Sequence, residues 1–344
     1  MERQPLVRLG VVGCGAHSHV HARAAATIPG LELAACCDVA ADRAQRWATE
    51  HGVGASFSDL GAMLDQVPLD GVILCTWPNQ HREQIEACLA HGVRNVLCEK
   101  SLALSGEEAL RIQSAAARAG ATVTEACMQR HHPAFRKLER LLAQGDLGPV
   151  DSIRAVFSNH EPDGAGPSGA DDWRFRAECG GGVAHDWMSY LVNACNHFSG
   201  GAPARVLGAG RPNERYGVVN RLHGMITYDN GVVGFVESSK IASFSEELEI
   251  ACAGGRLRLP IAWGIFGQVT IELIHRKKEW GYILTDRFEI EEADAYALQL
   301  ENFVQVIRGQ ASPVMPLAQS VVNVRTIEAL LTSAREGLPV DPLA

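Results

Sequence analysis

The sequence lacks an apolar run long enough to cross a membrane. No stretch of its 344 residues approaches roughly 18 consecutive apolar residues, which is about the minimum for a spanning helix. The start of the chain, residues 1–15, also lacks a separate apolar segment followed by a small-residue cleavage site, because its hydrophobic stretch leads directly into a glycine loop. We therefore expect a soluble, cytoplasmic protein that does not bind a membrane.

An excess of positive charge is missing as well. Lysine and arginine number 31 against 40 aspartates and glutamates, which gives a formal net charge of -9. Surfaces that bind a phosphate backbone need clustered positive charge. This balance excludes nucleic acid from the expected partners.

A regular disulfide framework is the third absence. The chain has ten cysteines, but their spacing is irregular, and Cys36 and Cys37 are adjacent. Several lie in strand-like runs, where a thiol behaves as a small hydrophobic group. We expect all of them to be reduced, as in an intracellular protein.

What the sequence does contain is a glycine turn between a strand and a helix. Residues 6–12 form an apolar run that predicts a buried strand, and the turn "GCGAHS" opens into an alanine-rich helix. Such glycines allow a pyrophosphate to approach the backbone, and the helix N-terminus offers free N–H groups. The third position of this fingerprint is Ser18 instead of glycine or alanine, so the turn alone is a weak sign. The cofactor-binding candidates here are Gly13, Gly15, Ala16 and His17.

Asp38 strengthens the interpretation as a dinucleotide site. It ends a second predicted strand, residues 31–37, about 20 residues beyond the turn, where a carboxylate can accept hydrogen bonds from ribose hydroxyls. The same charge would repel a 2′-phosphate, which favours NAD over NADP. Asp38 is also a candidate N-cap for the predicted helix 39–52, and the two roles are compatible. Arg43 lies near enough in the sequence to keep NADP open as a cofactor.

The alternation of strands and helices continues with strand 70–76, helix 81–92, strand 93–99 and helix 106–120. This pattern predicts a parallel, doubly wound sheet, in which ligands bind beyond the carboxyl ends of the strands. Further cofactor-binding candidates at those ends are Thr76, Trp77, Pro78, His81, Glu99 and Lys100.

Histidine-rich stretches do not predict a metal site. The run "HSHVH" at 17–21 belongs to the nucleotide turn and the first helical turn, and no cysteine or carboxylate cluster accompanies it. The pair His131 and His132 has the same standing. We expect no bound metal.

Six segments resemble, in the same order, signature segments of the Gfo/Idh/MocA oxidoreductase family. They are GVVGCGAHSHVHA, TWPNQH, NVLCEKSLAL, TEACMQRHHPAF, DWRFRAECGGGVAHDWMSY and DAYALQLENFVQVIRG. The resemblance implies an α/β protein with a dinucleotide-binding Rossmann domain at 1–125. A substrate-binding and oligomerisation domain with a large, open, mainly antiparallel sheet is implied for 126–344, and its C-terminal helices can pack back on the first domain.

The resemblance also implies three catalytic residues, Lys100, Asp186 and Tyr190. Two departures accompany them: Ser101 stands where the family usually has proline after the lysine, and Tyr190 stands where it usually has histidine. Tyrosine at this position resembles the subset with glucose-fructose oxidoreductase and the dihydrodiol and xylose dehydrogenases, in which it transfers the proton. A lysine ammonium at about 4 Å stabilises a phenolate by about 1 to 4 kcal/mol, depending on the local dielectric. The alternative role of Lys100 is an ion pair with Glu99 or Asp186.

Polar residues around the triple glycine are candidates for substrate binding. The segment 183–198 reads as a helix in which Asp186, Tyr190, Asn193 and His197 share one face. Such a stripe is either a solvated face or a site lining, and His197 is left unassigned. The substrate-binding candidates are Arg130, His132, Trp173, Arg174 and Asn193.

The second half of the chain shows the alternation of an antiparallel sheet. Strand patterns cover 152–159, 221–230, 231–242, 246–255, 256–261 and 268–284, with an Asn-Gly hairpin turn at 230–231 and helices near 294–308 and 317–336. One face of such a sheet packs on helices and the other needs a cover. A partner subunit can supply it, so we expect a homodimer or homotetramer.

The function predicted from all of this is NAD(P)-dependent hydride transfer between nicotinamide and a hydroxyl or keto carbon of a sugar, sugar derivative or cyclitol. Two alternatives stay open. One is redox-neutral, NAD-dependent cleavage of a glycoside, and the other is a dinucleotide-sensing regulator without enzymatic activity. The sequence does not identify the substrate, the carbon oxidised or the direction of the reaction.

Overall fold

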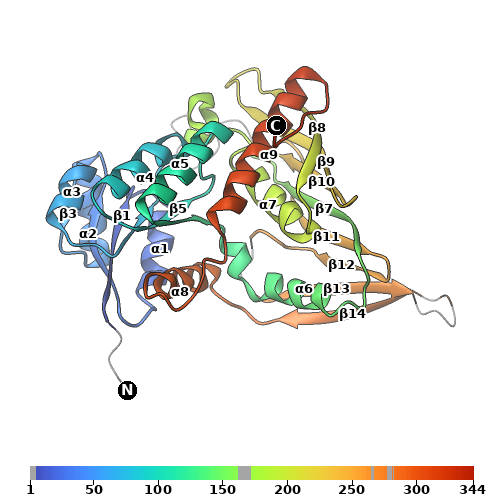
Figure 1. The fold of residues 1–344 in the computed structure, drawn as a ribbon, viewed down its shortest axis with the longest axis horizontal. Coiled ribbons are helices and arrows are strands. Elements are labelled where there is room, and N and C mark those ends of the chain that lie inside the picture. Colours follow the sequence, from blue (N-terminus) through green and yellow to red (C-terminus); the bar gives the residue numbers. More distant parts are fainter. Residues whose placement is uncertain (1–4, 162–171, 265–266, 277–280, 282) are drawn as a thin grey trace. The chain divides into compact units, whose positions relative to one another are not determined.

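The computed structural model describes residues 5–161, 172–264, 267–276, 281 and 283–344. The chain forms two compact units (Figure 1). Met1–His131 and Asp294–Val321 make the first, and His132–Ala293 and Val322–Ala344 make the second. The first unit is therefore built from two separate parts of the chain.

The first unit contains a parallel six-stranded sheet in the order β3-β2-β1-β4-β5-β6. Its strands are β1 (Val7–Val12), β2 (Leu31–Cys37), β3 (Ser56–Phe57), β4 (Gly71–Leu74), β5 (Asn95–Glu99) and β6 (Thr122–Ala126). This is the strand order of dinucleotide-binding folds. The predicted doubly wound parallel sheet is confirmed.

Helices follow the strands of this sheet in turn. They are α1 (Ser18–Ala25), α2 (Ala41–His51), α3 (Leu60–Gln66), α4 (His81–Ala90) and α5 (Gly106–Ala119). Neighbouring α4 and α5 pack together, and α1 packs on α8 (Ala295–Ile307), which returns from the far end of the chain (Figure 1). The short strand β3 and helix α3 were not predicted from the sequence.

The second unit contains an eight-stranded sheet in the order β14-β13-β12-β11-β7-β10-β9-β8. The strands are β7 (Val150–Ser158), β8 (Pro203–Pro212), β9 (Val219–Tyr228), β10 (Val233–Ser239), β11 (Ser245–Cys252), β12 (Gly255–Leu259), β13 (Val269–Arg276) and β14 (Ile283–Ile290). Neighbours are antiparallel except β7 and β10. The predicted large, mainly antiparallel sheet is confirmed. The prediction omitted β8, and the run 268–284, predicted as one strand pattern, contains β13 and the start of β14.

The Asn-Gly signal marks a real hairpin, but its turn differs from the expected two-residue type. Tyr228 and Val232 close a three-residue loop through a backbone hydrogen bond of 2.9 Å, and only Gly231 takes a positive φ, of 88°. A type I turn followed by a left-handed glycine has this geometry. Asn230 uses its side chain instead, donating to the carbonyl of Ser199 at 2.9 Å.

Helices of the second unit include α6 (Pro133–Ala143), α7 (Met188–Ser199) and most of α9 (Leu317–Glu336). Helix α7 packs on β7 and β10, and α6 packs on β13. Two of the largest fully buried side chains, Phe135 and Trp263, lie in contact within this core at 6.2 Å between ring centroids. Among the described residues of both units, no helix is long and apolar enough to cross a membrane.

Candidate active site

A cavity of about 460 Å³ in the first unit lies beyond the carboxyl ends of the parallel strands. Five of the predicted cofactor-binding residues line it, namely Gly13, Gly15, Asp38, Thr76 and Trp77. Arg43 and residues 58–60, which follow β3, also line the cavity. The sheet thus brings together the glycine turn, the carboxylate and the turn after β4, as parallel strand topology requires.

The glycine turn has the space that a dinucleotide needs. Gly13 has a φ of 87°, and a Cβ there would lie 2.8 Å from the carbonyl oxygen of Cys75, so a larger residue would clash with the backbone. A Cβ at Gly15 would meet no atom within 4 Å, which leaves open room beside the backbone for a phosphate group. Ser18, the departure from the fingerprint, is fully buried and donates its hydroxyl to the carbonyl of Gly15 at 2.6 Å. The serine therefore closes the turn from within, and Ala16 and His17 connect it to α1.

Asp38 fixes the glycine turn and does not cap helix α2. One carboxylate oxygen accepts the backbone N–H of Cys14 at 2.9 Å, and the other accepts that of Ala40 at 2.9 Å. Arg43 lies 3.3 Å from the same group. The N-cap residue of α2 is Ala40, without a side-chain cap, so the alternative capping role predicted for Asp38 is wrong.

Glu99, at the end of β5, is held by the histidines of the glycine-turn helix. Its Oε1 lies 2.7 Å from Nε2 of His21 and 3.5 Å from Nε2 of His17. Burial raises the pKa of Glu99, but the two histidines and Lys100 outweigh it and lower that pKa to about 2. The hydroxyl of Tyr296, on α8, lies 3.3 Å from Nε2 of His17. The carboxylate is therefore ionised and fixed at the strand end.

The segment after Glu99 carries Lys100, whose side chain is partly exposed. The peptide bond between Lys100 and Ser101 is cis. His81 is fully buried, with one ring nitrogen 2.9 Å from the carbonyl of Ser101 and the other 3.1 Å from that of Thr76. Burial lowers the pKa of His81, so its ring is neutral. His81 thereby links the turn after β4, where Pro78 begins a short 3-10 helix, to the lysine segment.

In the second unit, the triple glycine allows two stretches of backbone to pass very close together. Gly182 has a φ of 90° and forms a bridge with Val219, the first residue of β9. A Cβ at Gly182 would overlap the carbonyl oxygen of Val219, and one at Gly181 would lie 2.7 Å from that of Arg176. This close approach fixes the chain on both sides of the glycines, where Arg174 and Asp186 lie.

Asp186 accepts two cations on one oxygen. Its Oδ2 lies 3.1 Å from Nε of Arg174 and 3.3 Å from Nζ of Lys240, and the aspartate is only 2% exposed. Lys240 is also buried, bonds Glu161 at 2.7 Å and lies 3.8 Å above the ring of Trp187. Asp186 raises the pKa of Arg174. Asp186, Arg174 and Lys240 form what we call the Asp186 centre, in which two cations pair with one buried carboxylate and hold it in place.

Tyr190 and Asn193 are buried on α7, but Asp186 is not part of this helix. The helix begins at Met188, and Asp186 belongs to the turn before it, so the predicted four-residue stripe on one helix is wrong in its first member. The ring of Tyr190 stacks on Trp263, with centroids 6.3 Å apart. His197 lies 2.7 Å from Glu139 on α6, which identifies it as a packing contact between two helices.

The other substrate-binding candidates fall in different places. Trp173 lies directly before Arg174, and the guanidinium carbon of Arg174 lies 5.1 Å from the centroid of the Trp173 ring. Arg130 is buried in the first unit and lies 3.3 Å from Gln319 at the start of α9. His132 is the N-cap of α6 and accepts the N–H of Ala134 at 3.1 Å. Within the second unit, Arg174 pairs with Asp186, and Trp173 lies against the guanidinium of Arg174.

Sequence reasoning missed three residues that contact the predicted site residues: His21 and Tyr296 in the first unit and Lys240 in the second. His21 follows His17 by four residues on α1, and this helical spacing was a usable signal. Lys240 directly follows strand β10, and its pairing with Asp186 depends on the order of strands in the sheet. Tyr296 belongs to a segment that returns to the first unit after more than 160 residues, so no local pattern indicates its contact.

These features define a two-unit α/β protein whose first unit binds a dinucleotide, and the comparisons with known proteins agree. Residues 7–127 match a family described as "Oxidoreductase family, NAD-binding Rossmann fold". Residues 135–258 match "GFO/IDH/MocA C-terminal domain". The chain belongs to the Gfo/Idh/MocA family and is an NAD(P)-dependent oxidoreductase, as the resemblance predicted.

Relatives match along almost the whole chain. D-xylose 1-dehydrogenase (NADP(+)) 2 of Haloferax volcanii is 30% identical over 333 residues, covering 97% of this chain and 98% of the relative. A scyllo-inositol 2-dehydrogenase (NAD(+)) of Bacillus subtilis is 25% identical and covers 99% and 97%. The crystal structure of KijD10, a 3-ketoreductase from Actinomadura kijaniata in complex with NADP and TDP-benzene, superposes with a TM-score of 0.85 at 24% identity over 96% and 98% of the two chains. This last likeness supports the fold.

Proposed function

We propose that the protein is a sugar or cyclitol oxidoreductase that prefers NAD. The observation that carries the dinucleotide part is the cavity lined by Gly13, Gly15 and Asp38. Sugar and inositol dehydrogenases among the relatives support the substrate class. The redox-neutral and sensor alternatives have no such support.

The cofactor preference rests on Asp38. The ribose hydroxyls of NAD would compete for its carboxylate with the backbone N–H of Ala40 and with Arg43, since the other oxygen is taken by Cys14. A 2′-phosphate would meet this negative charge, although Arg43, with its side chain 48% exposed, offers a partial counter-charge. NAD is therefore the proposed cofactor and NADP the weaker one.

Proton transfer is assigned to Tyr190 and its activation to Lys100. Bound nicotinamide would accept a hydride from the substrate carbon or donate one to it, and the oxygen on that carbon would lose or gain a proton in the same reaction. Asp186 is proposed to orient the substrate or the tyrosine, because Arg174 and Lys240 hold its carboxylate in one place. Trp173 offers an indole face to the C–H side of a sugar ring. Arg130, His132 and Asn193 are proposed to shape the substrate site.

The test is nicotinamide absorbance with NAD and, separately, NADP over a panel of aldoses, inositols and sugar derivatives. Tyr190→Phe and Lys100→Met are expected to lower kcat by about 100-fold or more, the usual contribution of a general acid or base. Tyr216→Phe is the matched control, because the hydroxyl of Tyr216 has no hydrogen-bond partner among the described residues. Activity of the first two variants within a few fold of the wild type would contradict the assignment. Cofactor binding without any NADH release would instead favour the redox-neutral reaction.

A further inference from the structure

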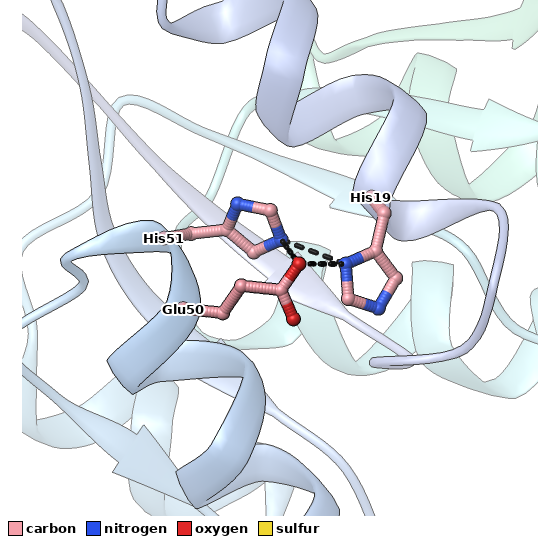
Figure 2. Close-up of side chains that lie close together, drawn as sticks. All are labelled: His19, Glu50 and His51. Carbon is pink, nitrogen blue, oxygen red and sulfur yellow. Dashed lines mark hydrogen bonds and ion pairs between the residues drawn. The ribbon is translucent and has the colours of Figure 1, made fainter.

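Three side chains on the first unit converge outside the dinucleotide cavity. His19 lies on α1, and Glu50 and His51 are the last two residues of α2 (Figure 2). Nδ1 of His19 and Nε2 of His51 are 2.8 Å apart, and Oε1 of Glu50 lies 3.3 and 3.8 Å from them. We propose that these three residues bind a divalent transition-metal ion, with Zn²⁺ the best match.

The geometry agrees with three corners of a tetrahedral site. Zinc binds histidine nitrogen at about 2.0–2.1 Å and carboxylate oxygen at about 2.0–2.2 Å, so ligand atoms in a tetrahedron are about 3.3–3.5 Å apart. The three separations, 2.8, 3.3 and 3.8 Å, bracket this value. The fourth position is open to water, since Glu50 is 62% exposed at its side chain.

The surroundings favour a cation and hold the rings in place. His51 lies in the last turn of α2, where the carbonyl end of the helix carries partial negative charge. The buried ring of Trp47 packs 4.6 Å from His51 and 6.3 Å from His19. Arg23 is a nearby positive charge that opposes a cation.

The histidine run at 17–21 therefore divides into two roles. His17 and His21 lie on Glu99, whereas His19 faces the end of the next helix (Figure 2). The sequence analysis expected no metal because no carboxylate lies near this histidine run in the sequence. The fold brings Glu50 next to His19 and so supplies that carboxylate. A bound ion would join α1, which follows the glycine turn, to α2, which follows Asp38.

The experiment uses the full chain, freed of metal by a chelator, and titrates Zn²⁺ against a chromophoric competitor. We expect one equivalent to bind, and its loss in His19→Ala and His51→Ala. Glu50→Gln, an exposed change that leaves the fold intact, is expected to weaken binding by at least the roughly 10- to 100-fold known for lost supporting residues. His91→Ala is the matched control, because His91 and Asp65 form a histidine–carboxylate pair at 3.5 Å, and no third ligand joins them among the residues that the structure describes.

Cobalt substitution and thermal unfolding give two further readouts. Co²⁺ at this site should show tetrahedral visible bands without thiolate charge transfer, which excludes the cysteines as ligands. Excess Zn²⁺ should raise the Tm of the wild type and of His91→Ala, raise that of Glu50→Gln less, and leave that of His19→Ala and His51→Ala unchanged. Equal Zn²⁺ binding by all variants, or no stoichiometric binding by the wild type, would overturn the proposal and leave a hydrogen-bonded histidine pair. None of these readouts depends on the enzymatic activity.

Discussion

Replacing Lys240 with methionine tests whether the Asp186 centre is a buried ionic network. The ammonium lies 3.3 Å from Asp186, 2.7 Å from Glu161 and 3.8 Å above Trp187. Removing one partner of a buried ion pair costs about 3–5 kcal/mol of unfolding free energy. Arg174 still pairs with Asp186 in the variant, and Glu161, 37% exposed at its side chain, can be hydrated again. We therefore expect a loss at or just below the lower end of that range, about 2–3 kcal/mol of unfolding free energy.

Urea unfolding followed by circular dichroism measures this loss, and methionine fills the volume of the lysine stem without a large cavity. The matched control is Arg46→Met, whose pair with Asp42 is exposed at 72% and 70% and is therefore expected to contribute little to stability. In the double variant Lys240→Met/Asp186→Asn, Asp186→Asn should lower the free energy of unfolding less than it does in the wild type, because the double variant has no Lys240 ammonium left without its carboxylate. A loss below about 1 kcal/mol for Lys240→Met, or strictly additive effects, would refute the network.

Three further predictions concern titration, cofactor choice and assembly. Burial raises the pKa of Glu125 from its ordinary value of 4.5 to about 7, so between these pH values the folded state holds a proton that the unfolded state has lost. The free energy of unfolding should therefore fall by about 3 kcal/mol as pH rises from 4.5 to 7. Glu125→Gln should flatten this slope in urea titrations, and an unchanged slope would contradict the role of Glu125. Asp38→Asn should lower the NAD-to-NADP ratio of kcat/KM at least about fivefold, because the contact between the carboxylate and the 2′-phosphate of NADP costs on the order of 1 kcal/mol even in water. A constant ratio in steady-state kinetics would show that this carboxylate does not set the cofactor preference. An apolar strip on neighbouring strands of the second sheet is formed by Leu207, Met225 and Phe235, which are 36–41% exposed. If this strip is the subunit interface, Phe235→Asp should reduce the molecular mass measured by light scattering. An unchanged mass would show that this face is not the interface.

Much of the first unit could be predicted from the sequence, because its information is local. The strand at residues 31–37 was predicted at the bounds that the structure shows, since an apolar run between turn signals specifies a buried parallel strand. Glycine spacing likewise placed Gly13 and Gly15 at the cavity. Short elements such as β3, with only two residues, carry no periodicity and were missed.

The centre around Asp186 was only half predictable, because its contacts are long-range. The family resemblance indicated Asp186, and the position just before the triple glycine indicated Arg174. Lys240 reaches Asp186 only through the pairing of β10 with β7 and β9. Helical spacing wrongly extended α7 back to Asp186, although backbone bonds from Trp187 and Met188 to Val183 form a separate turn there. Local periodicity does not distinguish such a turn from the helix that follows it.

The return of residues 294–321 to the first unit has a consequence for synthesis on the ribosome. The two parts of this unit are separated by the 162 residues from His132 to Ala293, and a ribosome adding about 5–20 residues per second needs about 8–30 s to cross that gap. During this interval α1 lacks α8, the helix that packs on it and supplies Tyr296 to His17. A nascent chain released before residue 294 would thus expose the face of α1 next to its glycine turn, and chaperones would meet the dinucleotide unit before it is complete.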